Sequence, residues 1–79
     1  MKIEVHLYAT LTRYIPEDVR NEDRSIEVPD GVTIKEVLET LKVPLDHVKL
    51  VFVDGVRADL KTELKPGSRL GVFPPVGGG

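Results

Sequence analysis

The sequence predicts a two-layer α+β domain in which one amphipathic helix covers one face of a mixed sheet. Five short segments are typical of strands, and one segment has the apolar period of a helix. Their order along the chain is strand, strand, helix, strand, strand, strand (β-β-α-β-β-β). The length of 79 residues, 41% of them hydrophobic and 30% charged, is typical of one small globular domain.

The first two strands are expected to form a hairpin. Residues 2–8 alternate strictly between polar and apolar positions, which predicts a strand with Ile3, Val5 and Leu7 on its buried face. Alternation resumes over residues 25–28 and ends at a Pro-Asp-Gly turn. The charged stretch 16–24 mixes arginines with irregularly spaced carboxylates, so we interpret it as a solvated loop and not as a metal or acid–base cluster.

The only helical pattern of some length begins at Thr33. Thr33 and Glu36 have the spacing of a capping box, in which each side chain binds the backbone N–H of the other residue. The apolar positions form one stripe, made by Ile34, Val37, Leu38 and Leu41. We interpret this stripe as core and not as a groove for a partner. Val43-Pro44 should stop the helix.

The second half of the chain predicts three strands. Residues 50–53 and 56–58 flank Asp54-Gly55, and Asp-Gly between two strand-like segments is a strong hairpin signal. A Pro-Gly turn then precedes the last strand, residues 68–73, which has Leu70 and Val72 on one face. With one helix crossing over, this last strand must lie inside the sheet.

Sequence signatures of an enzyme are missing. There is no cysteine, and no glycine-rich loop follows a strand and opens a helix to hold a nucleotide. His6 and His47 share no pattern, so we expect surface histidines and no metal site. A net charge of -2, with basic and acidic residues interleaved in the later strands, argues against nucleic-acid and membrane partners. The N-terminus resembles no signal peptide, and we expect a cytoplasmic protein without catalytic activity of its own.

The C-terminal segment Phe73-Pro74-Pro75-Val76-Gly77-Gly78-Gly79 is the most informative stretch. The two prolines stiffen its base, and the three glycines make its tip thin enough for a narrow channel, with an unhindered terminal carboxylate. We therefore expect a domain over residues 1–73 and a flexible tail over 74–79. A tail that is merely disordered is the alternative.

The chain resembles the ubiquitin-like β-grasp sulfur carriers of the MoaD and ThiS type, above all the small subunit of molybdopterin synthase. The resemblance covers nearly the whole chain, and the Phe-Pro-Pro-Val sequence before a terminal diglycine is its most specific part. The stretches that carry it are Leu7–Leu11, Pro29–Thr33, Val51–Gly55, Lys65–Leu70 and Phe73–Gly79. Thr12-Arg13 stands where many relatives have an arginine slightly earlier, and Gly77 where many have alanine or serine.

The resemblance implies that Gly79 is adenylated and converted to a thiocarboxylate that donates sulfur. The implied partners are an adenylating enzyme related to ubiquitin-activating enzymes, which supplies ATP and magnesium, a sulfur donor protein, and the larger MoaE-type subunit of molybdopterin synthase. The implied partner-binding residues are Phe73, Pro74, Pro75, Val76, Gly77 and Gly78, although Phe73 could equally pack on its own sheet. A carrier for thiamine or RNA thiolation, a ubiquitin-like protein modifier and a binding module with an inert tail stay open as alternatives.

Overall fold

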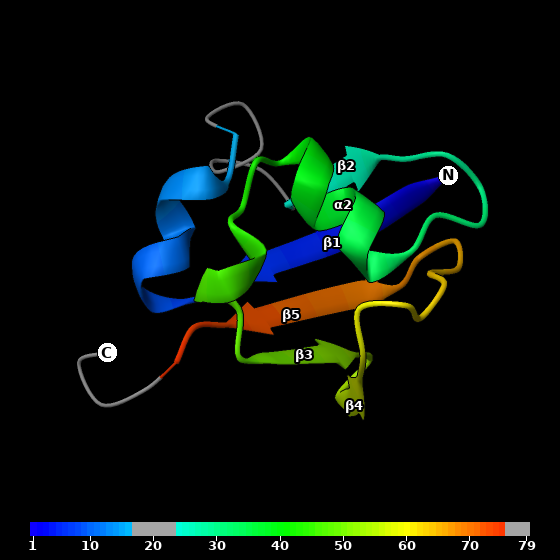
Figure 1. The fold of residues 1–79 in the computed structure, drawn as a ribbon. Helices are drawn as coiled ribbons and strands as arrows, with labels where there is room; N and C mark the ends of the chain where they lie inside the picture. Colours follow the sequence, from blue (N-terminus) through cyan, green and yellow to red (C-terminus); the bar gives the residue numbers. More distant parts are fainter. Residues whose placement is uncertain (17–23, 76–79) are drawn as a thin grey trace.

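The computed structural model describes residues 1–16 and 24–75 and shows one five-stranded sheet with a helix across one face (Figure 1). The strands are β1 (Lys2–Leu7), β2 (Ser25–Glu27), β3 (Leu50–Val53), β4 (Val56–Ala58) and β5 (Arg69–Phe73). The helices are the 3₁₀ helix η1 (Ala9–Tyr14), the α-helix α2 (Ile34–Thr40) and the 3₁₀ turn η2 (Leu45–His47). The predicted β-β-α-β-β-β order and α+β class are confirmed.

The sheet order is β2-β1-β5-β3-β4, so the last strand lies at the centre. β5 pairs in parallel with β1, with Val5 opposite Leu70, and antiparallel with β3, with Val51 opposite Val72. The hairpins β1–β2 and β3–β4 form the two sides, as predicted. Because a two-residue period applies on every strand, this register places the apolar residues of β1, β3 and β5 on one common face.

The core lies between that face and α2. Thr33 and Glu36 form the predicted capping box: the Thr33 hydroxyl accepts from the Glu36 N–H at 3.2 Å, and Glu36 accepts from the Thr33 N–H at 2.9 Å. The stripe is core as predicted, because Ile34, Val37 and Leu38 are fully buried and Leu41 is partly buried. The sheet contributes Ile3, Val5, Leu7, Val51, Leu70 and Val72.

Several boundaries differ from the prediction by one residue. β1 stops at Leu7, β2 at Glu27, and β5 starts at Arg69. Residues 9–14 form a 3₁₀ helix that is not among the elements predicted from the sequence. Ile15 is extended, as expected for a residue before proline, and the Thr12 hydroxyl donates to the Ala9 carbonyl inside the turn. Most of the charged stretch 16–24 lies outside the described residues.

No helix in the described parts of the chain has both the length and the apolar character needed to span a bilayer. The longest, α2, has seven residues.

Candidate functional site

The site predicted from the sequence begins where β5 ends. Phe73 is the last residue of β5 and is half-buried, Pro74 is half-buried, and Pro75 is exposed. Val76, Gly77, Gly78 and Gly79 lie outside the described residues, so their predicted roles stay predictions. The central position of β5 means that the base of the tail is attached to the middle of the sheet and not to an edge.

Two short helical segments surround the base of the tail. η1 packs against β1 and β5, and η2 follows α2 and precedes β3. Together they line a hollow of about 350 Å³ with the two prolines, through Thr10, Arg13, Asp46 and His47. Arg13 therefore lies beside the base of the tail, together with His47, which was expected only to be a surface histidine.

Phe73 stacks with other aromatic side chains on the face of the sheet opposite α2. Its ring lies parallel to that of Tyr8, with centroids 4.4 Å apart at 7°, and meets Phe52 edge-on at 5.6 Å and 83°. Such geometries are favourable for aromatic pairs. Gly71 lies beneath them: a β-carbon there would sit 3.7 Å from Tyr8 and 3.8 Å from Phe73. Phe73 thus both packs on its own sheet and stays partly exposed.

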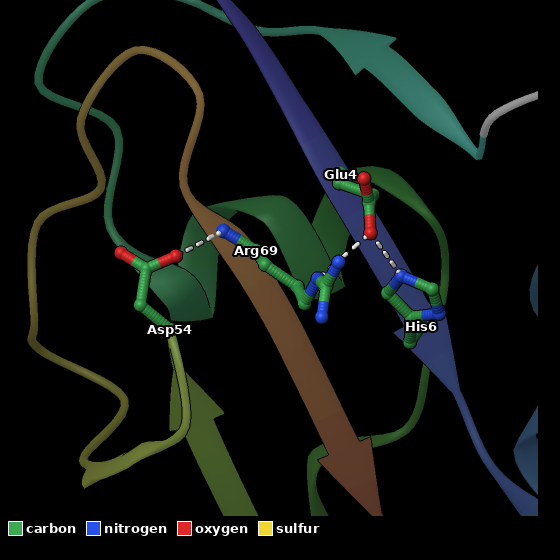
Figure 2. A network of polar contacts seen from close by, with 4 residues as sticks. All are labelled: Glu4, His6, Asp54 and Arg69. Carbon is green, nitrogen blue, oxygen red and sulfur yellow. Dashed lines mark hydrogen bonds and ion pairs between the residues drawn. The ribbon is translucent and has the colours of Figure 1, made fainter.

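A polar network borders these rings (Figure 2). Glu4 accepts hydrogen bonds from His6 and, at 2.9 Å, from Nε of Arg69. Asp54 accepts from the backbone N–H of Arg69 at 3.0 Å, and the Asp54 N–H donates to the Arg69 carbonyl at 2.9 Å. The hydrogen bond from His6, followed by the nearby charge of Arg69, lowers the pKa of the Glu4 carboxyl below its usual value. The network fastens β1, β5 and the β3–β4 turn to one another.

This network was not predicted from the sequence. The alternation of the first strand places Glu4 and His6 on the face opposite Ile3, Val5 and Leu7, but Arg69 is 65 residues from Glu4. Only the parallel register of β1 and β5, with Glu4 opposite Arg69, brings the two together. The signal that could have located it was the central position expected for the last strand.

Within residues 1–16 and 24–75, no three side chains among His, Asp and Glu gather in a way that could hold a metal ion. His6 is half-buried and contacts the carboxylate of Glu4, and His47 is exposed in the η2 turn. The features that stand out are instead a partly exposed aromatic cluster and the tail base beside it.

The chain is similar in sequence pattern and in structure to known proteins. Residues 1–77 match the family described as Mut7-C ubiquitin. No curated protein shows significant sequence similarity to the chain. Among solved structures, the chain is similar to a putative molybdopterin converting factor, subunit 1, from Pyrococcus furiosus, with a TM-score of 0.68 and 24% identity over 96% of this chain and 99% of that one.

Two further structures come from Haloferax volcanii. The small archaeal modifier protein 1 has a TM-score of 0.64 and 22% identity, covering 95% of this chain and 98% of that chain. The HVO 2177 protein has a TM-score of 0.69 and 27% identity, covering 100% of this chain and 87% of that chain. The likeness confirms the ubiquitin-like β-grasp fold that the sequence predicted. With a family match that spans nearly its whole length, the chain belongs to the Mut7-C ubiquitin family.

Proposed function

We propose that this chain is a sulfur carrier that works through the carboxylate of Gly79. The observation that carries the proposal is the ubiquitin-like fold with β5 at its centre, because that strand leads through Phe73, Pro74 and Pro75 directly into a terminus of three glycines. A rigid sheet then holds the base of the tail, while a tip without β-carbons is able to enter a narrow channel.

The proposed chemistry has three steps, of which the last two take place at the acyl carbon of Gly79. A carboxylate oxygen of Gly79 attacks the α-phosphate of ATP and displaces pyrophosphate, which gives an acyl-adenylate. A hydrosulfide equivalent from a sulfur donor protein then displaces AMP and leaves a thiocarboxylate. After the sulfur atom bonds to an acceptor, water attacks the acyl carbon, breaks the carbon–sulfur bond and restores the carboxylate. Glycine suits both displacements because it has no side chain to obstruct the acyl carbon.

Other proteins would supply the remaining chemistry. An adenylating enzyme related to ubiquitin-activating enzymes would bind ATP and magnesium, and a larger catalytic subunit would bind the acceptor. The structural neighbour described as a putative molybdopterin converting factor, subunit 1, favours molybdopterin as the destination of the sulfur. Thiamine synthesis and RNA thiolation use the same chemistry and are the alternatives within this class.

A second candidate function is a protein modifier, which the neighbour described as a small archaeal modifier protein favours. Activation of Gly79 would be the same, but the acyl group would pass to a lysine amine and form an isopeptide bond. The two functions differ in what is transferred: in the first, Gly79 gives up a sulfur atom and the chain is released, whereas in the second, AMP leaves and the whole chain becomes bonded to the lysine.

Pyrophosphate exchange tests the activation step that both functions share. We expect the adenylating enzyme of the source organism to exchange labelled pyrophosphate into ATP when the chain is added. A chain with Gly79 as a carboxamide is the matched control, because it differs only at the reacting group and should support no exchange. Equal exchange with both chains would contradict the proposal. A ladder of heavier conjugates in the native cells, with no thiocarboxylate, would favour the modifier.

A further inference from the structure

β4 is the outer strand at one edge of the sheet, and in the described part of the chain no strand pairs with its far side (Figure 1). Asp54 and Gly55 form the two-residue turn between β3 and β4, so Val53 and Val56 close the hairpin. A closing pair of this kind exchanges both of its backbone hydrogen bonds, and such pairs alternate along an antiparallel ladder. Arg57, one position further on, therefore directs its N–H and C=O to the open edge.

The two faces of this edge differ in character. Val56 lies opposite Val53, which packs against the core, so the side chains of Val56 and Ala58 are on the α2 side of the sheet. Val56 is nevertheless 68% exposed. Arg57 lies opposite Phe52, and its side chain is on the other side, where the aromatic rings stack. The edge thus presents an exposed apolar side chain on one face and a cation on the other.

Two hollows border β4. The larger, of about 620 Å³, is lined by Val53, Val56, Arg57, Ala58, Asp59 and Thr62. The smaller, of about 230 Å³, has Arg57, Ala58 and Asp59 in common with it. The loop that follows β4 therefore leaves room along the strand for the side chains of a neighbouring chain.

The cation at this edge has no counter-ion within residues 1–16 and 24–75. Arg57 is exposed and forms no ion pair with any of these residues. Asp59, the carboxylate closest to it in sequence, accepts instead from the Lys61 N–H at 2.8 Å and the Thr62 hydroxyl at 3.4 Å, in the turn after β4. Lys49 lines the smaller hollow and is also exposed. The charges along β4 therefore favour an acidic neighbour.

We propose that β4 binds an extended acidic segment of a partner protein, which joins the sheet as an additional strand. The backbone of one partner residue exchanges two hydrogen bonds with Arg57, and main-chain hydrogen bonds supply much of the affinity when a peptide joins a sheet edge. The side chain of that residue lies opposite Arg57, where an Asp or Glu forms a cross-strand ion pair. Its two neighbours lie opposite Val56 and Ala58. The edge therefore selects the pattern apolar–acidic–apolar.

The charge of Arg57 argues against a second copy of this chain as the occupant. Two β4 strands paired antiparallel through Arg57 would place the two arginines directly opposite each other, which is destabilising. A shift by one residue would lose both hydrogen bonds and turn the side chains to the wrong faces. A short, charged edge strand is a common protection against self-association, and here the same charge selects an acidic partner. The inference goes beyond the proposed function, because it involves no chemistry at Gly79.

Matched peptides test the pattern on the whole chain. The peptide acetyl-Ser-Val-Glu-Val-Ser-amide is titrated into ¹⁵N-labelled protein, as are two peptides with glutamine or lysine in place of the glutamate. We expect amide shifts in β3 and β4 and a Kd in roughly the millimolar range, given the few contacts. The glutamate peptide should bind roughly two- to fivefold more tightly than the glutamine peptide, as one cross-strand ion pair allows. The lysine peptide should bind most weakly.

Two readouts show whether the peptide is bound as a strand. Methylation of the glutamate backbone nitrogen removes the donor to the Arg57 carbonyl, and it should weaken binding about tenfold or more. The Arg57 amide should exchange with solvent faster than the amides of Val56 and Ala58 in the free chain, and the glutamate peptide should slow it. Equal binding of the methylated peptide, or an Arg57 amide that is already protected in the free chain, would overturn the inference.

Two variants assign the preference to one side chain. Arg57→Glu should reverse it, so that the lysine peptide binds more tightly than the glutamate peptide. Arg69→Gln is the matched control, because it removes a cation from β5, two strands away, and should leave the preference unchanged. A preference that survives Arg57→Glu, equal binding of the three peptides, or no binding well above the expected Kd would overturn the inference. A dimer of the free chain through β4 would overturn the choice of occupant.

Discussion

Leu38→Ala tests the claim that α2 holds the domain together through its apolar stripe. Leu38 is 0% exposed, and its helix neighbours Ile34 and Val37 are also 0% exposed. The surroundings of the deleted methyl groups are therefore fully packed and have little room to collapse. Leucine and alanine have nearly the same helix propensity, so the effect comes from lost burial and the remaining cavity. We expect a loss of about 3 kcal/mol, within the range of roughly 2–5 kcal/mol for such sites.

That loss is large for a domain of this size. A chain of 79 residues is expected to have roughly 4–12 kcal/mol of unfolding free energy in total. The loss should lower the melting temperature by about 10–25 °C. With an m value of about 1 kcal/mol/M, the urea midpoint should fall by about 3 M, or the protein should be unfolded without urea.

The assay is urea unfolding followed by far-ultraviolet circular dichroism, which does not depend on tryptophan. Glu39→Ala is the matched control, because Glu39 is exposed on the same helix and its truncation should change stability by less than about 0.5 kcal/mol. The packing argument would be refuted if the unfolding free energy of Leu38→Ala lay within about 1 kcal/mol of the wild-type value, as small a change as the control shows, and the m value were unchanged.

Three further substitutions test other parts of the account. Gly55→Ala should lower the unfolding free energy, measured by urea unfolding, by about 1–2 kcal/mol. Gly55 has φ +82° and open space around it, so this loss would come from backbone strain alone. Hydrogen bonds from the backbone and then the hydroxyl of Thr33 lower the pKa of Glu36, so this stabilisation is present above the unfolded-state pKa and is lost as the pH falls through the folded-state pKa. Glu36→Gln keeps an acceptor for the capping box, and it should make the urea midpoint less sensitive to acidification; an identical pH profile would contradict this. Arg69→Gln should lower the unfolding free energy by less than about 1 kcal/mol, because the ion pair with Glu4 is largely exposed; a larger loss would show that Arg69 is mainly structural.

The sequence alone predicted most of the fold because several local signals agreed. The strict alternation of residues 2–8, the capping box at Thr33 and the Asp-Gly turn each specify one element and its orientation. Together they leave few places for the last strand other than the centre of the sheet. The 3₁₀ helix at residues 9–14 was not predicted, because its apolar residues are few and a 3₁₀ turn has no long period to recognise.

The candidate site was predictable only where it is local in sequence. The tail was evident from its prolines and glycines. By contrast, the stacking of Tyr8 on Phe73 and the contact of Glu4 with Arg69 join residues from opposite ends of the chain. They depend on the parallel register of β1 and β5 to within one residue, and no pattern in the sequence fixes a register between strands so far apart.

The mass of the intact chain after reaction tests the central claim most directly. The chain is incubated with ATP, magnesium, the adenylating enzyme of its source organism and a sulfur donor, and a known carrier and its own enzyme serve as the positive control. We predict a product heavier by the difference between one sulfur and one oxygen atom, located at Gly79 by fragmentation and missing when Gly79 is a carboxamide. An unchanged mass, while the control carrier acquires sulfur in the same mixture, would contradict the sulfur-carrier function.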